Sequence, residues 1–213
     1  MIVKAKLILL GGGGHCKSCI DVIESTGLYE IHGILDRAEF VGTKVLDYDI
    51  IGTDEDVLKY HEQGFHFFIT VGQIKSAAVR KKLFCRLSDM GAEMATIVSA
   101  TAVLSKYAQL GAGTILMHQA IVNAAAKVGA NAIINTAANI EHDVVVGDHC
   151  HISTYAVVNG DCKIGNEVFI GSNATISSQV EVSDNTVVGA GAVVYKNIKQ
   201  QGTYAGNPAK IIG

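Results

Sequence analysis

The stretch INTAANIEHDVVVGDHCHISTYAVV, residues 134–158, decides the fold, because an aliphatic residue returns in it at every sixth position. The same register runs without a break from Val98 to Val194 and places Leu, Ile or Val at all seventeen positions. A period of six fits neither an amphipathic helix nor a simple alternating strand. It is typical of a hexapeptide β-helix, in which a short strand turns a corner after each repeat.

A small or β-branched residue stands four places after nearly every aliphatic position, and in nine of the seventeen repeats it is Ala. Three repeats would close one triangular coil, so the pattern predicts roughly five to six stacked coils. The aliphatic side chains would then form ladders inside the solenoid. Repeat spacing alone leaves the handedness of the coil open.

The composition is that of a cytosolic protein. The net charge is −3 and no Lys or Arg cluster is present, which argues against a nucleic-acid partner. Residues 1–10 lack the apolar core and cleavage site of a signal peptide. No stretch approaches the roughly 20 apolar residues of a membrane span. We therefore expect a cytoplasmic protein that binds neither nucleic acid nor membrane.

The five cysteines are interpreted as structural. Cys150 and Cys162 occupy the small-residue position of the repeat, so their side chains should point into the core. Cys16 and Cys19 form a CxxC pair, for which thioredoxin-like redox chemistry is the alternative. No second CxxC is present to complete a zinc site.

Charge is distributed unevenly along the chain. Residues 98–213 carry 13 charged side chains, against 24 in residues 1–97. A solenoid with three flat faces and so few charges should have at least one face covered. Because further copies of the chain would cover it most simply, we expect a homo-oligomer.

The first part of the chain predicts a small α/β domain. Buried strands are expected at 6–10, 30–35 and 66–71, and they alternate with helices expected at 16–25, 54–63 and 76–90. This alternation is typical of a parallel, Rossmann-like sheet. The sequence therefore predicts a Rossmann-like domain over 1–96 and a β-helix domain over 97–213.

A glycine loop lies where a phosphate-binding loop would be. Gly11, Gly13 and Gly14 follow the first strand and open the first helix, whose N–H groups and dipole attract anions. Asp36 ends the next strand, the position from which a dinucleotide fold contacts a ribose. The match to GxGxxG is partial, and a glycine turn for tight packing is the competing interpretation. About 95 residues hold one βαβ half, so a mononucleotide or a sugar nucleotide fits better than NAD.

Polar side chains interrupt the aliphatic pattern over residues 139–151. Ile140 and Val146 keep the register, so the residues between and after them should project from turns or outer faces. A neutral imidazole beside carboxylates can accept a proton from an attacking amine or hydroxyl near neutral pH. We expect the chemistry there. The polar residues concerned are Glu141, His142, Asp143, His149 and His151.

Two other interpretations of these histidines are open. They can be ordinary solvated residues of an outer face. They can also bind a metal, but a stack of histidines within one chain needs partners 18 residues apart. His118, His142 and His149 find no histidine at that spacing. A zinc site made by His149 and His151 across a subunit interface is the remaining form of this alternative.

Several motifs together resemble one known family. They are GxGGHxK at 11–17, I-N-T at 134–136, I-E-H-D at 140–143, H-I-S at 151–153, V-N-G-D at 158–161 and A-G-N-P-A-K at 205–210. In this combination the chain is similar to the sugar acyltransferases of the sialic acid O-acetyltransferase and bacillosamine (UDP-4-amino-sugar) N-acetyltransferase family. The resemblance covers nearly the whole chain. It implies a left-handed parallel β-helix, a homotrimer, acetyl-CoA as co-substrate without a metal, and active sites between subunits.

The resemblance also implies roles for individual residues. His142 matches the presumed general base, and Asp143 matches the acidic residue that assists it, although many relatives have Glu there. The residues implied for the nucleotide sugar are Gly11, Gly13, Gly14, His15, Lys17, Asp36, Arg37, Gly72 and Asn135. Those implied for coenzyme A are His151 near the thioester, Gly160, Ser172 and Ala190 along the groove, and Lys210 near the phosphates.

The mechanistic hypothesis is direct transfer in a ternary complex. The 4-amino group of a UDP-4-amino-4,6-dideoxy sugar loses a proton to His142 as it attacks the thioester, and an N–H near Gly160 stabilises the oxyanion. O-acetylation of a sialic acid is the second hypothesis, supported by the run ISTYAVVNGD at 152–161. A non-catalytic trimeric scaffold or a zinc hydratase on the same solenoid is the third.

Overall fold

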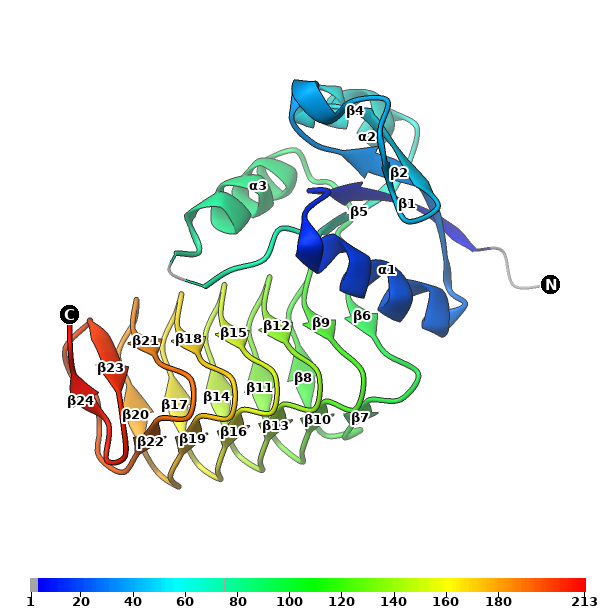
Figure 1. Ribbon diagram of the computed structural model, residues 1–213. Helices are drawn as coiled ribbons and strands as arrows, with labels where there is room; N and C mark the ends of the chain where they lie inside the picture. Colours follow the sequence, from blue (N-terminus) through cyan, green and yellow to red (C-terminus); the bar gives the residue numbers. More distant parts are fainter. Residues whose placement is uncertain (1–3, 75) are drawn as a thin grey trace.

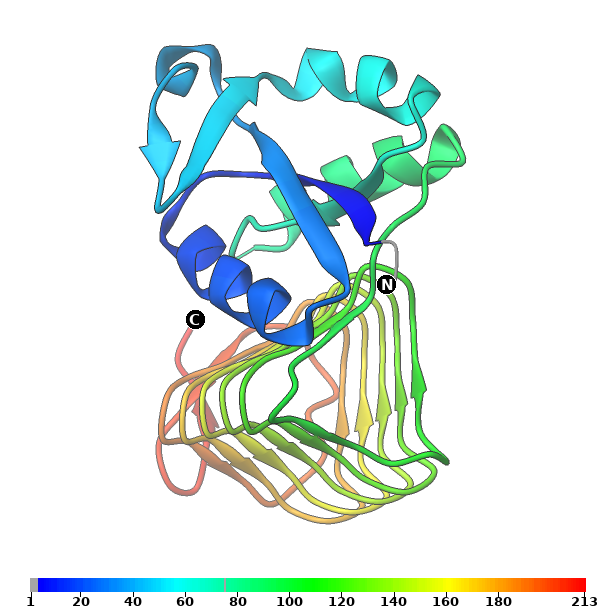
Figure 2. The ribbon, with the colours of Figure 1, turned by 90° about the vertical axis from the view of Figure 1, so that its right-hand side faces the viewer.

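The computed structural model describes residues 4–74 and 76–213. A solenoid of stacked coils carries an α/β domain along one side (Figure 1). Viewed along the solenoid axis, the coils are triangular in cross-section, and the α/β domain covers one of the three sides (Figure 2). The predicted combination of an α/β domain and a three-sided parallel β-helix is therefore confirmed.

The α/β domain contains one sheet, with strand order β3-β4-β2-β1-β5. Strands β1, β2, β4 and β5 are parallel, and β3 is antiparallel to β4. In chain order the elements are β1 Ala5–Leu10, α1 Gly14–Thr26, β2 Tyr29–Leu35, η1 Ala38–Phe40, β3 Lys44–Val45, β4 Tyr48–Gly52, η2 Asp54–Asp56, α2 Val57–Glu62, β5 His66–Ile69 and α3 Ala78–Asp89.

The strands and helices expected in this domain are present, with their ends shifted by up to three residues. The β3–β4 hairpin is not evident from the sequence, because β3 has two residues and only Val45 and Ile50 give the hairpin a buried apolar face. The hairpin matters for the site, since β4 extends the sheet beyond β2 and brings Asp54 next to the end of β2.

Two-residue strands from β6 to β22 form the three faces of the solenoid. The domain-side face has β6 Ile97–Val98, β9 Ile115–Leu116, β12 Ile133–Ile134, β15 His151–Ile152, β18 Phe169–Ile170 and β21 Val187–Val188. The open face has β7 Val103–Leu104, β10 Ile121–Val122, β13 Asn139–Ile140, β16 Val157–Val158, β19 Thr175–Ile176 and β22 Val193–Val194. The charged face has β8 Gln109–Leu110, β11 Lys127–Val128, β14 Val145–Val146, β17 Lys163–Ile164 and β20 Glu181–Val182. At the C-terminal end, β23 Thr203–Ala205 and β24 Lys210–Ile211 extend the domain-side face.

The second residue of each strand points inward and belongs to the predicted aliphatic register. From Leu116 onward these residues are buried, and they pack with the small corner residues in one continuous core. In the first coil Val98, Leu104 and Leu110 are only partly covered, because no coil lies beneath them. Each ladder position removes an aliphatic side chain from water, which stabilises the solenoid by roughly 1.5–3 kcal/mol per residue.

The first residue of each strand points outward and gives each face its character. On the domain-side face Ile97, Ile115 and Ile133 are buried beneath α1, in a cluster that includes Cys19 and Ile20. Burial raises the pKa of the Cys16 thiol to about 11 and also raises that of Cys19. Both cysteines are therefore packing residues of the domain interface, as interpreted from the sequence.

No helix of residues 4–74 and 76–213 is long and apolar enough to cross a bilayer.

Candidate active site

A cavity of about 730 Å³ opens at the carboxyl ends of β1, β2 and β5, next to the solenoid. Ligands of open α/β sheets bind at this edge. Seven residues expected to bind substrate line it: Gly11, Gly13, Gly14, His15, Asp36, Arg37 and Gly72. Lys17 is exposed on α1 and is not part of the lining, because the helix turns it away from the loop. The cavity is also lined by residues that the sequence did not suggest, among them Asp54, Thr70, Gln73 and Ile74.

Two glycines of the loop, Gly11 and Gly12, are needed for close packing, whereas a Cβ at Gly13 or Gly14 would meet no atom within 4 Å. Gly11 has a φ of 104°, and a Cβ there would lie 2.5 Å from a methyl carbon of Val71. The Gly12 N–H donates to Asp36 Oδ2 at 2.5 Å, and the Arg37 N–H donates to Asp36 Oδ1 at 2.7 Å. Asp36 thus orders the loop, in addition to any contact with a ribose. No side chain of the described residues caps α1, so the N–H groups of its first turn can meet an anion.

Two histidines lie at the deep end of this cavity: His151 is buried, and His15 is half-buried with its Nε2 enclosed. Burial lowers the pKa of His15 to about 3 and that of His151 to about 4, so both rings are neutral near pH 7. The carbonyl oxygen of Gln73 lies 2.6 Å from His151 Nδ1, which places the ring proton on Nδ1. His151 Nε2 then accepts from Asn135 Nδ2 at 3.0 Å. Asn135 therefore reaches the cavity through His151 and does not itself line it.

His142 lies in a different environment, at the corner between the open and charged faces. Its side chain is 63% exposed, and its Nδ1 lies 2.8 Å from Asp143 Oδ2. The hydrogen bond to Asp143 raises the pKa of His142. The shorter Asp143 side chain therefore reaches the ring directly, and Nε2 is free to accept a proton from a substrate.

Gly160 supports the His142 ring. A Cβ at Gly160 would lie 2.7 Å from both Cε1 and Nε2 of His142, closer than any real side chain could be. The ring therefore lies directly on the backbone of the next coil, and only glycine leaves room for it. The Gly160 carbonyl accepts from the Gln179 N–H, and its own N–H has no protein partner among the described residues.

The polar run at 139–151 does not form one cluster within a chain. His142 lies at the corner opposite the domain-side face, and His151 lies on that face beneath the α/β domain. His149 lies at the corner between the charged and domain-side faces and is buried. Its Nδ1 lies 3.0 Å from Asn131 Nδ2, and its ring packs edge-on against the ring of Phe84. His149 projects from a turn and His151 from an outer face, as expected, but the α/β domain packs over both, so neither side chain is exposed to solvent.

The residues expected to contact coenzyme A are distributed over separate surfaces. Ser172 and Ala190 line a groove of about 560 Å³ on the domain-side face, together with Ile74. Ile74 also lines the cavity of the α/β domain, so the groove and the cavity adjoin. Lys210 lines another hollow, of about 460 Å³, at the C-terminal end of the solenoid. Gly160 lies with His142 at the far corner.

Buried polar contacts hold the cavity against the solenoid. Arg80 is 1% exposed; its Nη1 donates to the carbonyls of Ile69 and Val71, and its Nη2 donates to Asn131 Oδ1 at 2.7 Å. This residue was not suggested by the sequence, where it is one of several cations on an amphipathic helix. The Nε of this buried guanidinium has no partner among the described residues, but its paired Nη1 and Nη2 donors fix the segment after β5 in one position.

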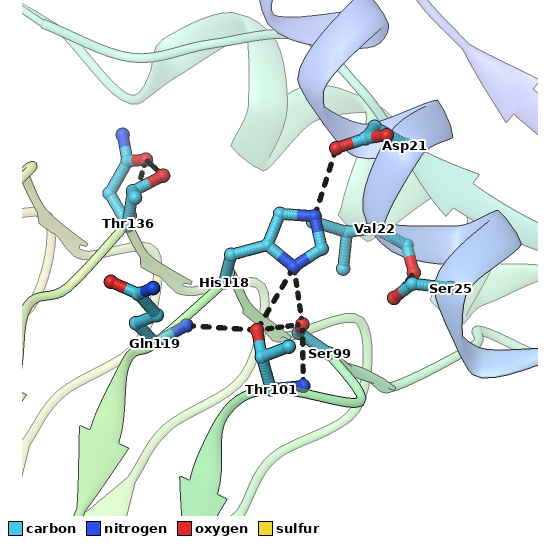
Figure 3. A network of polar contacts seen from close by, with 9 residues as sticks. Asp21, Val22, Ser25, Ser99, Thr101, His118, Gln119 and Thr136 are labelled. Carbon is cyan, nitrogen blue, oxygen red and sulfur yellow. Dashed lines mark hydrogen bonds and ion pairs between the residues drawn. The ribbon is translucent and has the colours of Figure 1, made fainter.

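A second set of contacts joins α1 to the first coils (Figure 3). His118 Nε2 lies 2.9 Å from Asp21 Oδ2, and His118 Nδ1 lies 2.7 Å from Ser99 Oγ. Ser99 is 2% exposed, and its Oγ also accepts from the Thr101 N–H. The three side chains resemble a hydrolase triad in type, but the buried, doubly bonded serine makes this a structural link between the two domains.

Among the described ranges 4–74 and 76–213, no group of three or more His, Cys, Asp and Glu side chains is arranged to hold a metal ion.

The fold and the cavity together define a hexapeptide-repeat acyltransferase with an α/β domain of the nucleotide-binding type. Residues 6–87 match the model of the PglD N-terminal domain, and residues 161–196 match that of the bacterial transferase hexapeptide (six repeats). No curated protein sequence matches the chain.

Solved structures extend this match over the full chain. PerB from Caulobacter crescentus, in complex with CoA and GDP-perosamine, is 30% identical, with 100% of both chains covered and a TM-score of 0.91. The acetyltransferase domain of PglB from Neisseria gonorrhoeae, in complex with acetyl coenzyme A, is 29% identical, with 99% of this chain and 100% of that chain covered and a TM-score of 0.92. WeeI from Acinetobacter baumannii, at 22% identity, 98% and 100% coverage and a TM-score of 0.85, shows the shared fold.

The chain belongs to the sialic acid O-acetyltransferase and bacillosamine N-acetyltransferase family of hexapeptide-repeat sugar acyltransferases. Its solenoid is accordingly a left-handed parallel β-helix.

Proposed function

We propose that this protein transfers the acetyl group of acetyl-CoA to the 4-amino group of a nucleotide-activated amino sugar. The observation that carries the proposal is the imidazole of His142, which lies on Gly160 with Nδ1 bound to Asp143 and Nε2 free. A histidine held in this way is a general base for an attacking amine. The relatives support the reaction class, since PerB is described as a perosamine N-acetyltransferase.

The α/β cavity is the proposed site of the nucleotide sugar. Its glycine loop, the uncapped start of α1 and Asp36 provide contacts for a diphosphate and a ribose. The sequence resemblance favoured a uridine nucleotide, whereas the nucleotide sugar in the PerB structure is a guanosine one. The uridine nucleotide stays a prediction.

The proposed assembly is a homotrimer. One solenoid face is covered by the α/β domain, and the charged face presents Lys127, Lys163 and Glu181 to solvent. The open face presents apolar side chains such as Val103, which is 59% exposed, and Ile121. A second copy packed on this face would bury them, and three copies close a ring with three identical interfaces.

The assembly completes the site. His142 lies at an edge of the open face, and the nucleotide cavity with His151 lies on the opposite side of the same solenoid. One chain therefore cannot bring its own His142 to the sugar in its own cavity. In a closed trimer, His142 of one protomer would face the cavity and groove of the adjoining protomer.

The proposed mechanism is direct transfer. The 4-amino nitrogen attacks the thioester carbon, and its proton passes to His142 Nε2 while Asp143 stabilises the imidazolium. The N–H of Gly160 stabilises the oxyanion of the tetrahedral intermediate. The carbon–sulfur bond then breaks, an amide forms, and coenzyme A leaves as the thiol once it regains a proton. The simultaneous presence of CoA and GDP-perosamine in PerB crystals supports a ternary complex.

An assay of thiol release tests the proposal. The protein is mixed with acetyl-CoA and, in parallel, with UDP- and GDP-linked 4-amino-4,6-dideoxy sugars and with free sialic acids. We expect release of coenzyme A with a nucleotide-linked amino sugar, and mass spectrometry should identify the amide. Turnover with sialic acid alone would favour O-acetylation. No turnover with any acceptor would favour a scaffold.

A further inference from the structure

Gln73 is a buried residue of the cavity that the mechanism above does not use. It is 3% exposed and lines the cavity between the glycine loop and the solenoid. Its side-chain oxygen, Oε1, is enclosed and has no hydrogen-bond partner among residues 4–74 and 76–213. A buried amide oxygen without a donor costs about 1–3 kcal/mol, so such groups are usually satisfied by a ligand or a water.

We propose that Gln73 Oε1 accepts a hydrogen bond from the hydroxyl of the acceptor sugar on carbon 3, next to the carbon that carries the reacting amine. Gln73 is thereby a specificity-determining residue for the acceptor. The inference rests on the proposed function, since it names the part of the substrate that meets the deep end of the cavity.

The position of Gln73 in the cavity indicates the sugar end of the substrate. Asp36 and Arg37 lie at the ends of the sheet strands, where the nucleoside would bind. Gln73 lies at the solenoid end, where its carbonyl oxygen is 2.6 Å from Nδ1 of His151. The next residue, Ile74, lines both this cavity and the groove with Ser172. The sugar must lie at this end, because the thioester approaches from the solenoid.

The chemistry of Gln73 Oε1 selects the group that it binds. Phosphate oxygens and the thioester carbonyl are acceptors and cannot pair with a carbonyl oxygen. The amine presents its lone pair to the thioester carbon and one N–H to His142. The hydroxyl on the neighbouring carbon, carbon 3, is a further donor at the same end of the cavity, and it is the donor assigned to Gln73 Oε1.

The surroundings hold Gln73 in place before the substrate binds. Arg80 binds the carbonyls of Ile69 and Val71, and His151 binds the carbonyl of Gln73 itself, so the backbone is tied at every second residue from the end of β5 to Gln73. Because Oε1 is itself enclosed, a substrate that lacks the donor leaves this oxygen without a partner. A site of this kind rejects an analogue that lacks the hydroxyl.

The test measures kcat/KM with a nucleotide-linked 4-amino-4,6-dideoxy sugar and with its 3-deoxy analogue. The wild-type protein should prefer the hydroxylated sugar by about 10- to 100-fold. Gln73→Met keeps the size of the side chain and removes the acceptor, so it should abolish the preference. Gln73→Glu keeps an acceptor oxygen and should retain it. This double comparison isolates the contact between Gln73 and the hydroxyl.

Binding of the nucleoside diphosphates GDP and UDP by calorimetry is the control. Their affinities should be the same for wild type and Gln73→Met, because neither ligand carries the sugar. Equal loss of diphosphate and sugar binding in that variant, or a wild-type protein that accepts both sugars equally, would overturn the assignment of Gln73 while the acetyltransferase function stands. No acetyl transfer to either sugar by the wild type would overturn the proposed function and the assignment together.

Discussion

The deep end of the α/β cavity and the far corner of the solenoid both carry histidines, and the two regions shift the pKa of the imidazole in opposite directions. In the cavity, burial lowers the pKa values of His15 and His151, and both rings stay neutral. At the corner, His142 is exposed and the carboxylate of Asp143 raises its pKa. A carboxylate beside the ring favours the protonated imidazole, whereas burial without a counter-charge disfavours it. A ring that only donates or accepts a hydrogen bond can be buried.

The largest effect should follow from removing the corner base. His142→Ala should lower kcat by about 100- to 10,000-fold, since a positioned base contributes that much. Binding of acetyl-CoA, measured by calorimetry, should persist, because the groove with Ser172 and Ala190 is untouched. A loss below tenfold would remove His142 from the role of base.

The second-largest effect should follow from filling the space beneath the His142 ring. Gly160→Ala places a Cβ where the His142 ring lies, 2.7 Å from two ring atoms, so the ring must move. A displaced base should reduce kcat by about 10- to 100-fold. The coil should still fold, because the core ladders are unchanged. Gly213→Ala, outside the cavity and the groove, where a Cβ meets no atom within 4 Å, is the matched glycine control for kcat. Equal activity of Gly160→Ala and wild type would show that the ring is not held there.

The pH dependence separates the two kinds of histidine. The rate should rise with pH as His142 loses its proton, since only the neutral ring can accept one from the amine. Asp143 raises the pKa of His142, so Asp143→Asn should move the acid limb of the kcat profile to lower pH and lower kcat by roughly tenfold. If the acid limb of Asp143→Asn stays at the pH of the wild type, the group that titrates in the kcat profile is not His142.

His151 provides the contrast in the same measurement. Its pKa of about 4 places its titration below the range in which the corner base acts. His151→Gln should therefore leave the position of the acid limb unchanged above pH 5, even where it lowers the rate. A shift of the limb in this variant would contradict the neutral assignment.

The smallest effect is expected for the link between α1 and the first coils. Asp21 is 73% exposed on its side chain, and such surface pairs contribute about 0.2–1 kcal/mol. Asp21→Asn should lower Tm by no more than a few degrees, as measured by calorimetry, and should leave kcat unchanged. A large loss of activity would show that the Asp21–His118 contact positions the cavity.

Much of the fold could be predicted from local patterns. The sixfold aliphatic register predicts the solenoid, since each repeat buries one side chain against the repeats above and below. The glycine loop and Asp36 were likewise found from their places after strands. The β3–β4 hairpin and buried Arg80 could not be found, because a two-residue strand and a cation on an amphipathic helix have no distinct local pattern.

The sequence by itself determined the three-sided solenoid, the glycine loop and the likeness to sugar acyltransferases, because these depend on spacing along the chain. Only the tertiary structure decided which polar residues share a site. It separated His142 from His149 and His151, buried the latter two beneath the α/β domain, and placed Gln73 beside His151. The physical reason is the 18-residue coil: neighbours in the sequence lie on different faces, whereas neighbours in space come from other coils or from the domain packed against them.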